Sequence, residues 1–312
     1  MKTRFLCLAA AIFADVFFSV TPFCAFAQEA ENPAGEVISG NIILSEDGKT
    51  VTGTVDKDIA TVQIPKGVKA IGAKAFYHCE KLRSVEIPEG VVQIDDWAFS
   101  YCRSLAEVKL PSSLKKIGAG AFSWCTALFF IEFPESLASI GGNAFYSCQT
   151  LESVNMPRHV TKILTGTFYG CVKLENINFS PLLEEIESAA FVNCAIKSLK
   201  FPPALSLIGE SAFYHCPSLE KISVPASVTK IGAKAFAHCQ SLSLAEWSAN
   251  ARIKQIDADV FSKSPVYYTL NLPSSVKLVN FVPLETEQKE EPAAQEEQKA
   301  EEDKESVSDN AE

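Results

Sequence analysis

The sequence lacks an excess of positive charge. Its 312 residues contain 28 Lys and Arg against 38 Asp and Glu, and the formal net charge is −10. A nucleic-acid partner needs a surface rich in Lys and Arg, because these side chains replace the counterions along the phosphates. We therefore expect no nucleic-acid partner. Much of the acidity lies in residues 285–312, which leaves the rest of the chain close to neutral.

Recognisable enzyme signatures are also lacking. The chain has no phosphate-cradling glycine loop, no nucleophile elbow and no helix motif with two metal-ligating histidines. Acidic pairs such as Asp95 and Asp96 fall at expected turns, where solvated surface is the usual explanation. We expect no catalysis and no cofactor.

Long apolar runs are lacking apart from Phe5–Val20. That run follows basic residues and precedes a small-x-small triplet at 25–27, which is typical of a cleaved secretory signal at 1–27. It is short and interrupted by Asp15, so it does not suit a membrane span. We expect an exported protein, either secreted, at the cell surface or periplasmic, with no transmembrane segment in the mature chain. Lipid attachment through Cys24 is a less favoured alternative, because the residues before it are not small.

The chain does contain a repeat with a period of about 23 residues. One column of the repeat consists of Phe76, Phe99, Phe122, Phe145, Phe168, Phe191, Phe213, Phe236 and Phe261. A second column, three residues later, consists of Cys79, Cys102, Cys125, Cys148, Cys171, Cys194, Cys216, Cys239 and then Ser264. A third column consists of Ile71, Ile94, Ile117, Ile140, Ile163, Ile186, Ile208, Ile231 and Ile256.

Each row predicts a strand, a turn and a corner. In residues 75–97, Leu82, Val85 and Ile87 alternate with polar residues, as in a strand with one buried face, and Pro88 ends the strand. After a second inward step the turn often carries glycine, which we attribute to a favoured positive φ. These turn glycines are Gly72, Gly118, Gly141, Gly209 and Gly232. The Ala-Phe pair then begins a helical or irregular corner.

One row buries too little apolar surface to offset the ordering of its backbone. Stacking solves this problem, because each strand then bonds to the rows above and below it and each apolar column becomes continuous. We therefore expect a solenoid of about nine to ten coils, with strands about 4.8 Å apart.

The row pattern C-x-x-L-x-x-V-x-I-P-x-x-V-x-x-I-G-x-x-A-F, repeated from about Ile59 to Phe281, resembles the BspA-like (bacterial surface antigen) subfamily of leucine-rich repeats. The resemblance implies a right-handed, curved solenoid with a mainly parallel sheet on the concave side and short helical or irregular corners on the other. It also implies an exported bacterial protein that attaches to host matrix proteins or other cells. It implies no catalytic residue.

The ends of the repeat suggest the domain boundaries. Residues 28–58 include Asp47 and Gly48 between alternating segments, which predicts a β-hairpin that caps the first coil. The repeat domain spans 59–283, and its last row is atypical. Residues 284–312 have almost nothing to bury and predict an acidic disordered tail.

Two of the columns invite a chemical interpretation. The cysteines at 79 to 239 would form disulfides between neighbouring rows or a ladder of buried free thiols. We favour thiols, because stacked identical side chains point the same way and Ser264 suits the same slot. Two adjacent His-Cys pairs, His215-Cys216 and His238-Cys239, suggest a metal site. We expect no metal, because the cysteines should point inward and the histidines outward.

The outward strand positions carry the candidate binding site. Almost all are polar, but Phe129 and Phe130 break the rule, so they form either a protein-binding centre or a local packing contact across a neighbouring coil. The candidate residues are Phe129, Phe130, Glu107, Lys109, Glu132, Glu152, Asn155, Glu175 and Asn178.

We therefore expect a protein that binds another macromolecule, most simply a protein, through its concave sheet. The alternatives are a periplasmic scaffold or assembly factor, and a carbohydrate-binding protein that stacks sugars on the corner aromatics. Those aromatics are Tyr77, Tyr101, Trp124, Tyr146, Tyr169 and Tyr214.

Overall fold

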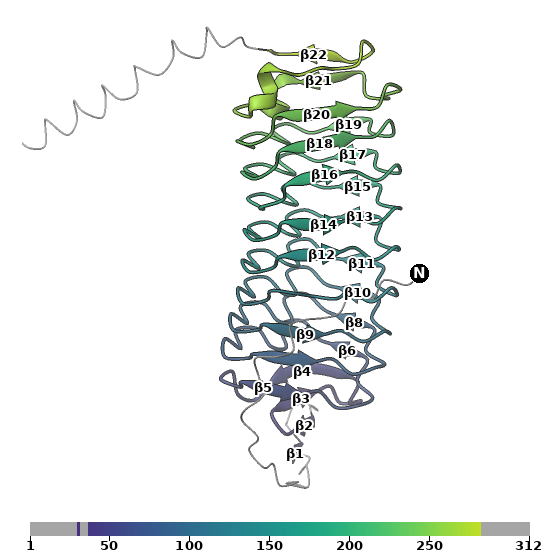
Figure 1. The fold of residues 1–312 in the computed structure, drawn as a ribbon. Coiled ribbons are helices and arrows are strands. Elements are labelled where there is room, and N and C mark those ends of the chain that lie inside the picture. The colour runs from purple at the N-terminus through teal and green to yellow at the C-terminus, as the bar shows by residue number, and fades with distance from the viewer. Residues whose placement is uncertain (1–29, 32–36, 282–312) are drawn as a thin grey trace, which may run out of the picture.

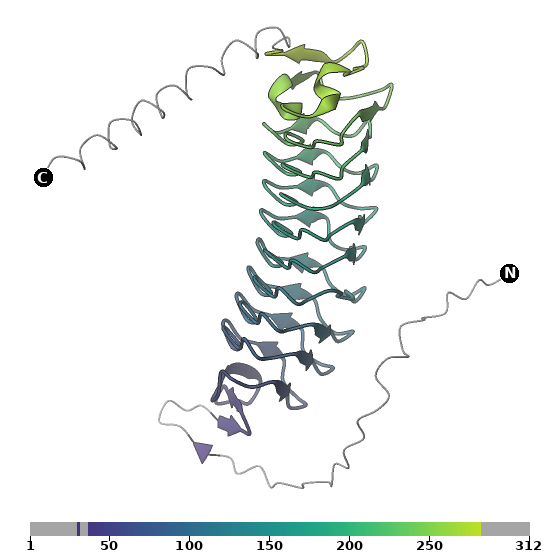
Figure 2. The same cartoon turned by 60° about the vertical axis from the view of Figure 1, so that its left-hand side comes forward.

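The computed structural model describes residues 30–31 and 37–281 and places the repeats in a single stack of coils (Figure 1). The predicted signal peptide at 1–27 and the predicted acidic tail at 284–312 lie outside the described residues. About ten coils of about 23 residues form a solenoid of parallel strands with little helix, which confirms the expected fold class. Figure 2 shows that the stack bends gently along its length.

One side of the solenoid, the long-strand face, consists of strands of three or four residues. These are β5 (Thr61–Gln63), β7 (Ser84–Glu86), β9 (Glu107–Lys109), β12 (Ser153–Asn155), β14 (Asn176–Asn178), β16 (Ser198–Lys200), β18 (Lys221–Val224) and β20 (Leu244–Trp247). Val85 is buried between Ser84 and Glu86, because successive side chains of a strand point to opposite faces. The pairing is parallel and in register, with Ser84 opposite Glu107 of the next coil.

A second side, the short-strand face, consists of two-residue strands along the isoleucine column. The sequence led us to expect a single sheet, so this second set of strands was not predicted. These are β6 (Ala70–Ile71), β8 (Gln93–Ile94), β10 (Lys116–Ile117), β11 (Ser139–Ile140), β13 (Lys162–Ile163), β15 (Glu185–Ile186), β17 (Leu207–Ile208) and β19 (Lys230–Ile231). Their isoleucines meet at the same register in successive coils, as Ile94 does with Ile117.

Strand pairing along the long-strand face is interrupted twice. It forms three groups, β5-β7-β9, β12-β14 and β16-β18-β20. Between the first two groups, the coil that carries Phe130 forms no strand on this face and pairs here only through an isolated bridge between Phe130 and Ser153. The second interruption precedes β16, in the row where Cys194 and Ile196 are one residue closer together than their counterparts. The continuous ladder that we expected is therefore divided into blocks.

The phenylalanine column forms the centre of the core. All nine rings are fully buried, from Phe76 to Phe261. Neighbouring ring centroids lie 5.0 to 5.7 Å apart with interplanar angles of 2° to 11°. Each ring therefore packs against the rings above and below it, and stacked aromatic pairs of this spacing contribute beyond simple burial.

The third side, the turn face, holds the Phe and Cys columns in tight turns. From Phe76 to Phe236, the residues two before and two after each Phe have positive φ, as Lys74 (58°) and His78 (61°) do. The N–H groups of Lys74, Phe76 and His78 donate to carbonyl oxygens of the next coil over 2.7 to 3.0 Å, while those of Ala75 and Tyr77 donate within the coil. Regular turns thus satisfy the backbone without a helix. Within the described residues, 3-10 helices occur only in the last coils, as η1 (Ala258–Phe261) and η2 (Pro265–Tyr268).

The turn glycines are explained by close contact between coils, and our attribution to positive φ was wrong. None of the five, Gly72, Gly118, Gly141, Gly209 or Gly232, has a positive φ. A Cβ built on Gly232 would lie 2.4 Å from the backbone nitrogen of Glu210 in the preceding coil. Leu164 occupies this column in the row where pairing of the short-strand face is interrupted, between β11 and β13.

The first coil is joined by an antiparallel set of strands: β1 (Ala30–Glu31), β2 (Val37–Ser39), β3 (Ile42–Leu44) and β4 (Thr50–Thr54). Asp47 and Gly48, whose φ is 67°, form the turn between β3 and β4. Because β4 pairs in parallel with β6, it covers that end of the short-strand face. At the other end, β21 (Gln255–Asp257) pairs with β22 (Lys277–Val279).

Candidate binding surface

Phe129 and Phe130 are exposed on the long-strand face. Their exposed fractions are 54% and 46%, whereas Leu128 and Ile131 on either side are buried at 0% and 2%. Neither ring contacts another aromatic ring of the described chain. The buried neighbours hold the backbone against the core and direct the two rings into solvent. About half of each ring is exposed and half is covered by the protein, so the binding centre and the local packing contact both stay predictions at this point.

Carboxylates surround the two rings. By the 23-residue spacing, Glu107 holds the position of Phe130 one coil earlier. In the coil after, the backbone N–H of Glu152 donates to the carbonyl oxygen of Phe129 over 3.2 Å. Glu132 lies two positions beyond Phe130 on the same coil. All three glutamates are exposed, and within the described chain none forms an ion pair or a side-chain hydrogen bond. We call these five residues the aromatic-acidic patch.

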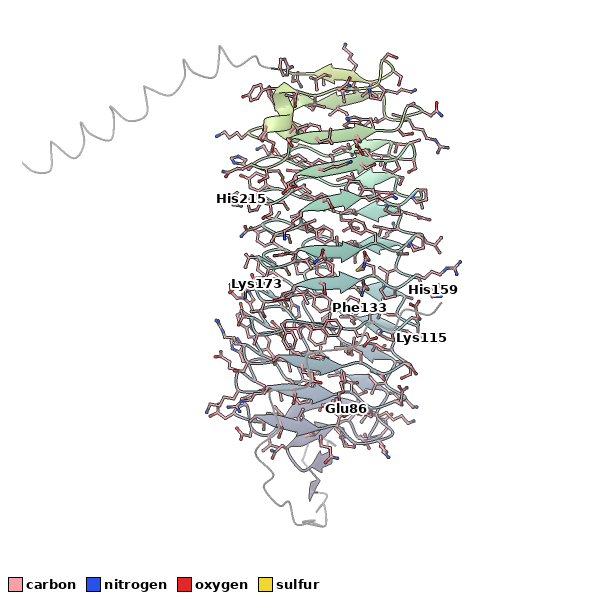
Figure 3. All side chains as sticks on the ribbon, in the orientation of Figure 1. Glu86, Lys115, Phe133, His159, Lys173 and His215 are labelled. Carbon is pink, nitrogen blue, oxygen red and sulfur yellow. The ribbon has the colours of Figure 1, made fainter. Side chains whose placement is uncertain are left out.

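The other predicted site residues have partners inside the protein. Lys109 lies 3.9 Å from Glu86 across the strands β9 and β7, and Glu175 accepts a hydrogen bond of 2.8 Å from Lys197. Asn178 donates to the side-chain oxygen of Asn155 over 2.6 Å. Figure 3 places Glu86 on the long-strand face, toward the N-terminal end of the stack. These residues extend the surface but differ from the patch, because their polar groups are already paired.

A hollow lies beyond the patch at the second interruption of strand pairing. Its volume is about 500 Å³, and its lining includes Glu175, Asn178, Lys197, Lys200 and Phe201. It opens where the row with Cys194 is one residue short. Two of the predicted residues, Glu175 and Asn178, therefore border a concavity that the sequence did not indicate.

The cysteine column is a ladder of buried free thiols, as we expected. The structure also gives a reason for the residue type. From Cys102 to Cys239, each thiol donates a hydrogen bond to the carbonyl oxygen of the phenylalanine in the preceding coil, as Cys148 does to Phe122 over 3.2 Å. Ser264 makes the same bond to Phe236 over 2.8 Å. Burial raises the pKa of the thiols from Cys79 to Cys216, that of Cys79 to about 11, so these groups are protonated and unreactive near neutral pH.

The histidines lie on the outer surface, away from the thiols. His78 is within 3.2 Å of Glu80, and His215 is within 3.3 Å of Asn193. Burial lowers the pKa of His238, and the charge of Lys263 lowers it further. Figure 3 shows His215 at the edge of the turn face. Among residues 30–31 and 37–281, no three Cys, His, Asp or Glu side chains are placed to hold a metal ion.

The corner aromatics form a ladder whose rings cover one another. His78 and Tyr101 stack at 4.5 Å, Tyr101 and Trp124 at 5.8 Å, and Tyr146 and Tyr169 at 4.8 Å. A sugar stacks on the face of an aromatic ring, but in these three stacked pairs that face is turned toward the next ring. Arg103 lies over both Tyr101 and Trp124, a contact that comparison of neighbouring rows could have suggested.

Comparisons with known proteins agree with this architecture. The family model of the BspA type leucine rich repeat region, which has six copies, matches residues 55–175 and 161–281. A leucine rich cell surface protein from Faecalibacterium prausnitzii has a similar fold, with 22% identity and a TM-score of 0.56 over 78% of this chain and 94% of that one. A leucine-rich repeat protein of T. pallidum is 28% identical, with a TM-score of 0.47 over 64% of this chain and 86% of that one. The search of curated proteins found no match.

Two further findings bear on function class. No helix in the described part of the chain is long and apolar enough to cross a membrane. The leucine-rich-repeat solenoid is typically a scaffold without enzymatic activity. Because the repeat model covers most of the chain and the solenoid has the expected columns, the protein belongs to the BspA-type leucine-rich repeat family.

Proposed function

We propose that this protein is an exported binding protein that attaches to another protein through its long-strand face. Phe129 and Phe130 form the centre of the contact, and the flanking strands provide a polar surround. The role is adhesin-like attachment to host matrix or to other cells, and no step of it requires catalysis or a cofactor.

The observation that carries the proposal is the exposure of two adjacent large apolar side chains on a face whose other exposed side chains are mostly polar. Covering the exposed half of each ring removes roughly 100 Å² of apolar surface from water, which is worth about 2 kcal/mol per ring. Values of this size are typical of the few residues that dominate a protein interface. The rigid core beneath the patch means that little ordering is needed on binding.

The test compares three forms of the full chain in pull-downs from host matrix and bacterial envelope fractions. These are the native chain, the double variant Phe129→Ala with Phe130→Ala, and the control Leu244→Ala. Leu244 is 45% exposed on the same face but lies far from the patch. We expect the double variant to lose its partner while its melting temperature stays unchanged, and the control to retain both. Retained binding by a folded double variant would refute the role of the patch.

The place of action is tested separately. Protease treatment of intact cells should clip the protein if it is displayed at the surface, whereas a periplasmic scaffold or assembly factor would be protected. A glycan array tests the carbohydrate alternative. The support for a protein partner over a glycan is geometric, because the rings at Phe129 and Phe130 are open while those of the corner ladder cover one another.

A further inference from the structure

The charges around Phe129 and Phe130 indicate the chemistry of the partner. This step rests on the proposed function, because it takes the aromatic-acidic patch as the binding centre. We propose that the patch binds a cationic polypeptide segment, in which apolar side chains cover the two rings while lysine or arginine side chains meet Glu107, Glu132 and Glu152.

The first support is the contrast between these glutamates and the other carboxylates of the long-strand face. Glu86 is near Lys109, Glu175 is bonded to Lys197, and Glu246 lies 2.6 Å from Lys221. Away from the patch, cross-strand partners thus neutralise most of the negative charge. Around the two phenylalanines three carboxylates remain without a cation within the described chain.

The second support is the position of the three glutamates. They lie on three consecutive coils, one before, one on and one after the coil that carries the rings. Coils are spaced by about 5 Å, so each carboxylate is within reach of a long basic side chain whose backbone rests on the rings. An exposed cluster of like charges is unfavourable in the free protein, and an approaching cation removes that repulsion.

The same charges disfavour other classes of partner. Nucleic acids and sulfated or uronic polysaccharides would bring negative charge against three uncompensated carboxylates. An anionic membrane surface would meet the same repulsion. A neutral sugar would use the rings but leave the glutamates without a role, so it predicts no dependence of binding on salt.

The experiment uses the full chain and three short synthetic peptides in a titration that measures affinity. The first peptide carries leucines flanked by lysines, the second replaces each leucine by serine, and the third replaces each lysine by glutamate. We expect the first to bind best, and its affinity to fall as salt screens the charges.

Two matched triple variants then locate the effect. The patch variant is Glu107→Gln, Glu132→Gln and Glu152→Gln. The control, Glu184→Gln, Glu220→Gln and Glu246→Gln, removes the same charge at positions outside the candidate site. We expect about tenfold weaker binding of the lysine-leucine peptide to the patch variant, with little remaining salt dependence, and near-native binding to the control. Thermal melting checks that both variants are folded.

The outcomes separate the two proposals. If the phenylalanine double variant loses the peptide while the patch glutamine variant binds it with native affinity, the cationic partner is refuted and the binding role of the rings stands. Equal binding of the glutamate-leucine peptide would also refute the cationic partner. If neither set of substitutions changes binding of the lysine-leucine peptide or of the captured partner, the proposed function fails as well.

Discussion

Replacing Cys148 by serine and by alanine tests why the column consists of cysteine. Cys148 is fully buried, and its thiol donates to the carbonyl oxygen of Phe122 over 3.2 Å. If the column were only an apolar slot, alanine would be tolerated better than serine, because a buried hydroxyl without a partner costs roughly 1 to 3 kcal/mol. The hydrogen bond predicts the opposite order.

The magnitude follows from the contacts. Alanine loses the sulfur, worth about 1 kcal/mol of packing and transfer, and a hydrogen bond worth about 1 kcal/mol, for a total of about 2 kcal/mol. Serine loses part of the volume but keeps the donor, as Ser264 does toward Phe236, so we expect a loss of about 1 kcal/mol. Serine at position 148 should therefore be more stable than alanine by about 1 kcal/mol.

The assay is urea unfolding of the native chain and the two variants, followed by circular dichroism, with the slope compared among the three. An unchanged slope shows that the same unit unfolds in each case. If the alanine variant proves as stable as the serine variant or more so, the thiol-to-carbonyl bond is not the reason for the column. A native chain whose thiols cannot be titrated in denaturant without reductant would contradict the free-thiol ladder itself.

Three further predictions concern the backbone and the thiols. Because burial raises the pKa of Cys79 from 9.0 to about 11, and that of the deeper thiols also, the unfolded chain loses these protons first. The contribution of the protonated thiols to the free energy of unfolding should be fully present below about pH 9 and should be lost as the pH rises through 11. Alkaline denaturation curves measure this loss. Ala189→Gly should stabilise the protein by about 1 kcal/mol in urea, since Ala189 has a φ of 56°, whereas Ala190→Gly in the buried column should destabilise it. Gly232→Ala should lower stability by about 1 to 3 kcal/mol in the same assay, because its Cβ would meet the Glu210 backbone at 2.4 Å.

The columns of the repeat were predictable from the sequence because they follow from periodicity alone. A side chain that recurs every 23 residues in a stacked fold must lie in the same environment in each coil, so burial of the Phe, Cys and Ile columns follows directly. The outward position of Phe130 follows from strand alternation about Ile131. Phe129 belongs instead to the two-residue outward step that follows the Leu column in each row, as Arg83 and Ser84 follow Leu82. The exposure of both rings could therefore be predicted once the repeat was aligned row by row.

The turn face was harder to predict, because its backbone is not encoded by the usual residues. Positive φ at Lys74, Trp97 and His78 is rare for such side chains, and the geometry is held by hydrogen bonds to the next coil. The turn glycines misled us for the complementary reason: glycine is usual where φ is positive, yet Gly232 is required by the approach of a neighbouring backbone. Contacts between coils decide both cases, and a single row does not display them.

The candidate site was predictable in its residues but not in its charge balance. The sequence placed Glu107, Glu132, Glu152 and Glu175 on one face without distinguishing them. Only the pairing of side chains across coils shows that Glu175 has a cationic partner and that, in the part of the chain the structure describes, the other three have none. The interruption of strand pairing beside Phe130 likewise depends on how two coils sit against each other, which repeat spacing alone does not specify.

The interruption of strand pairing beside Phe130 has a mechanical consequence for the attachment role that we propose. When the solenoid is pulled along its long axis, coils that pair on both strand faces distribute the force over many backbone hydrogen bonds. The coil after β9 has few such hydrogen bonds on the long-strand face. We expect extension in a single-molecule pulling experiment to begin at this seam. A pulling force on a partner bound as we propose would then first extend the protein beside Phe129 and Phe130.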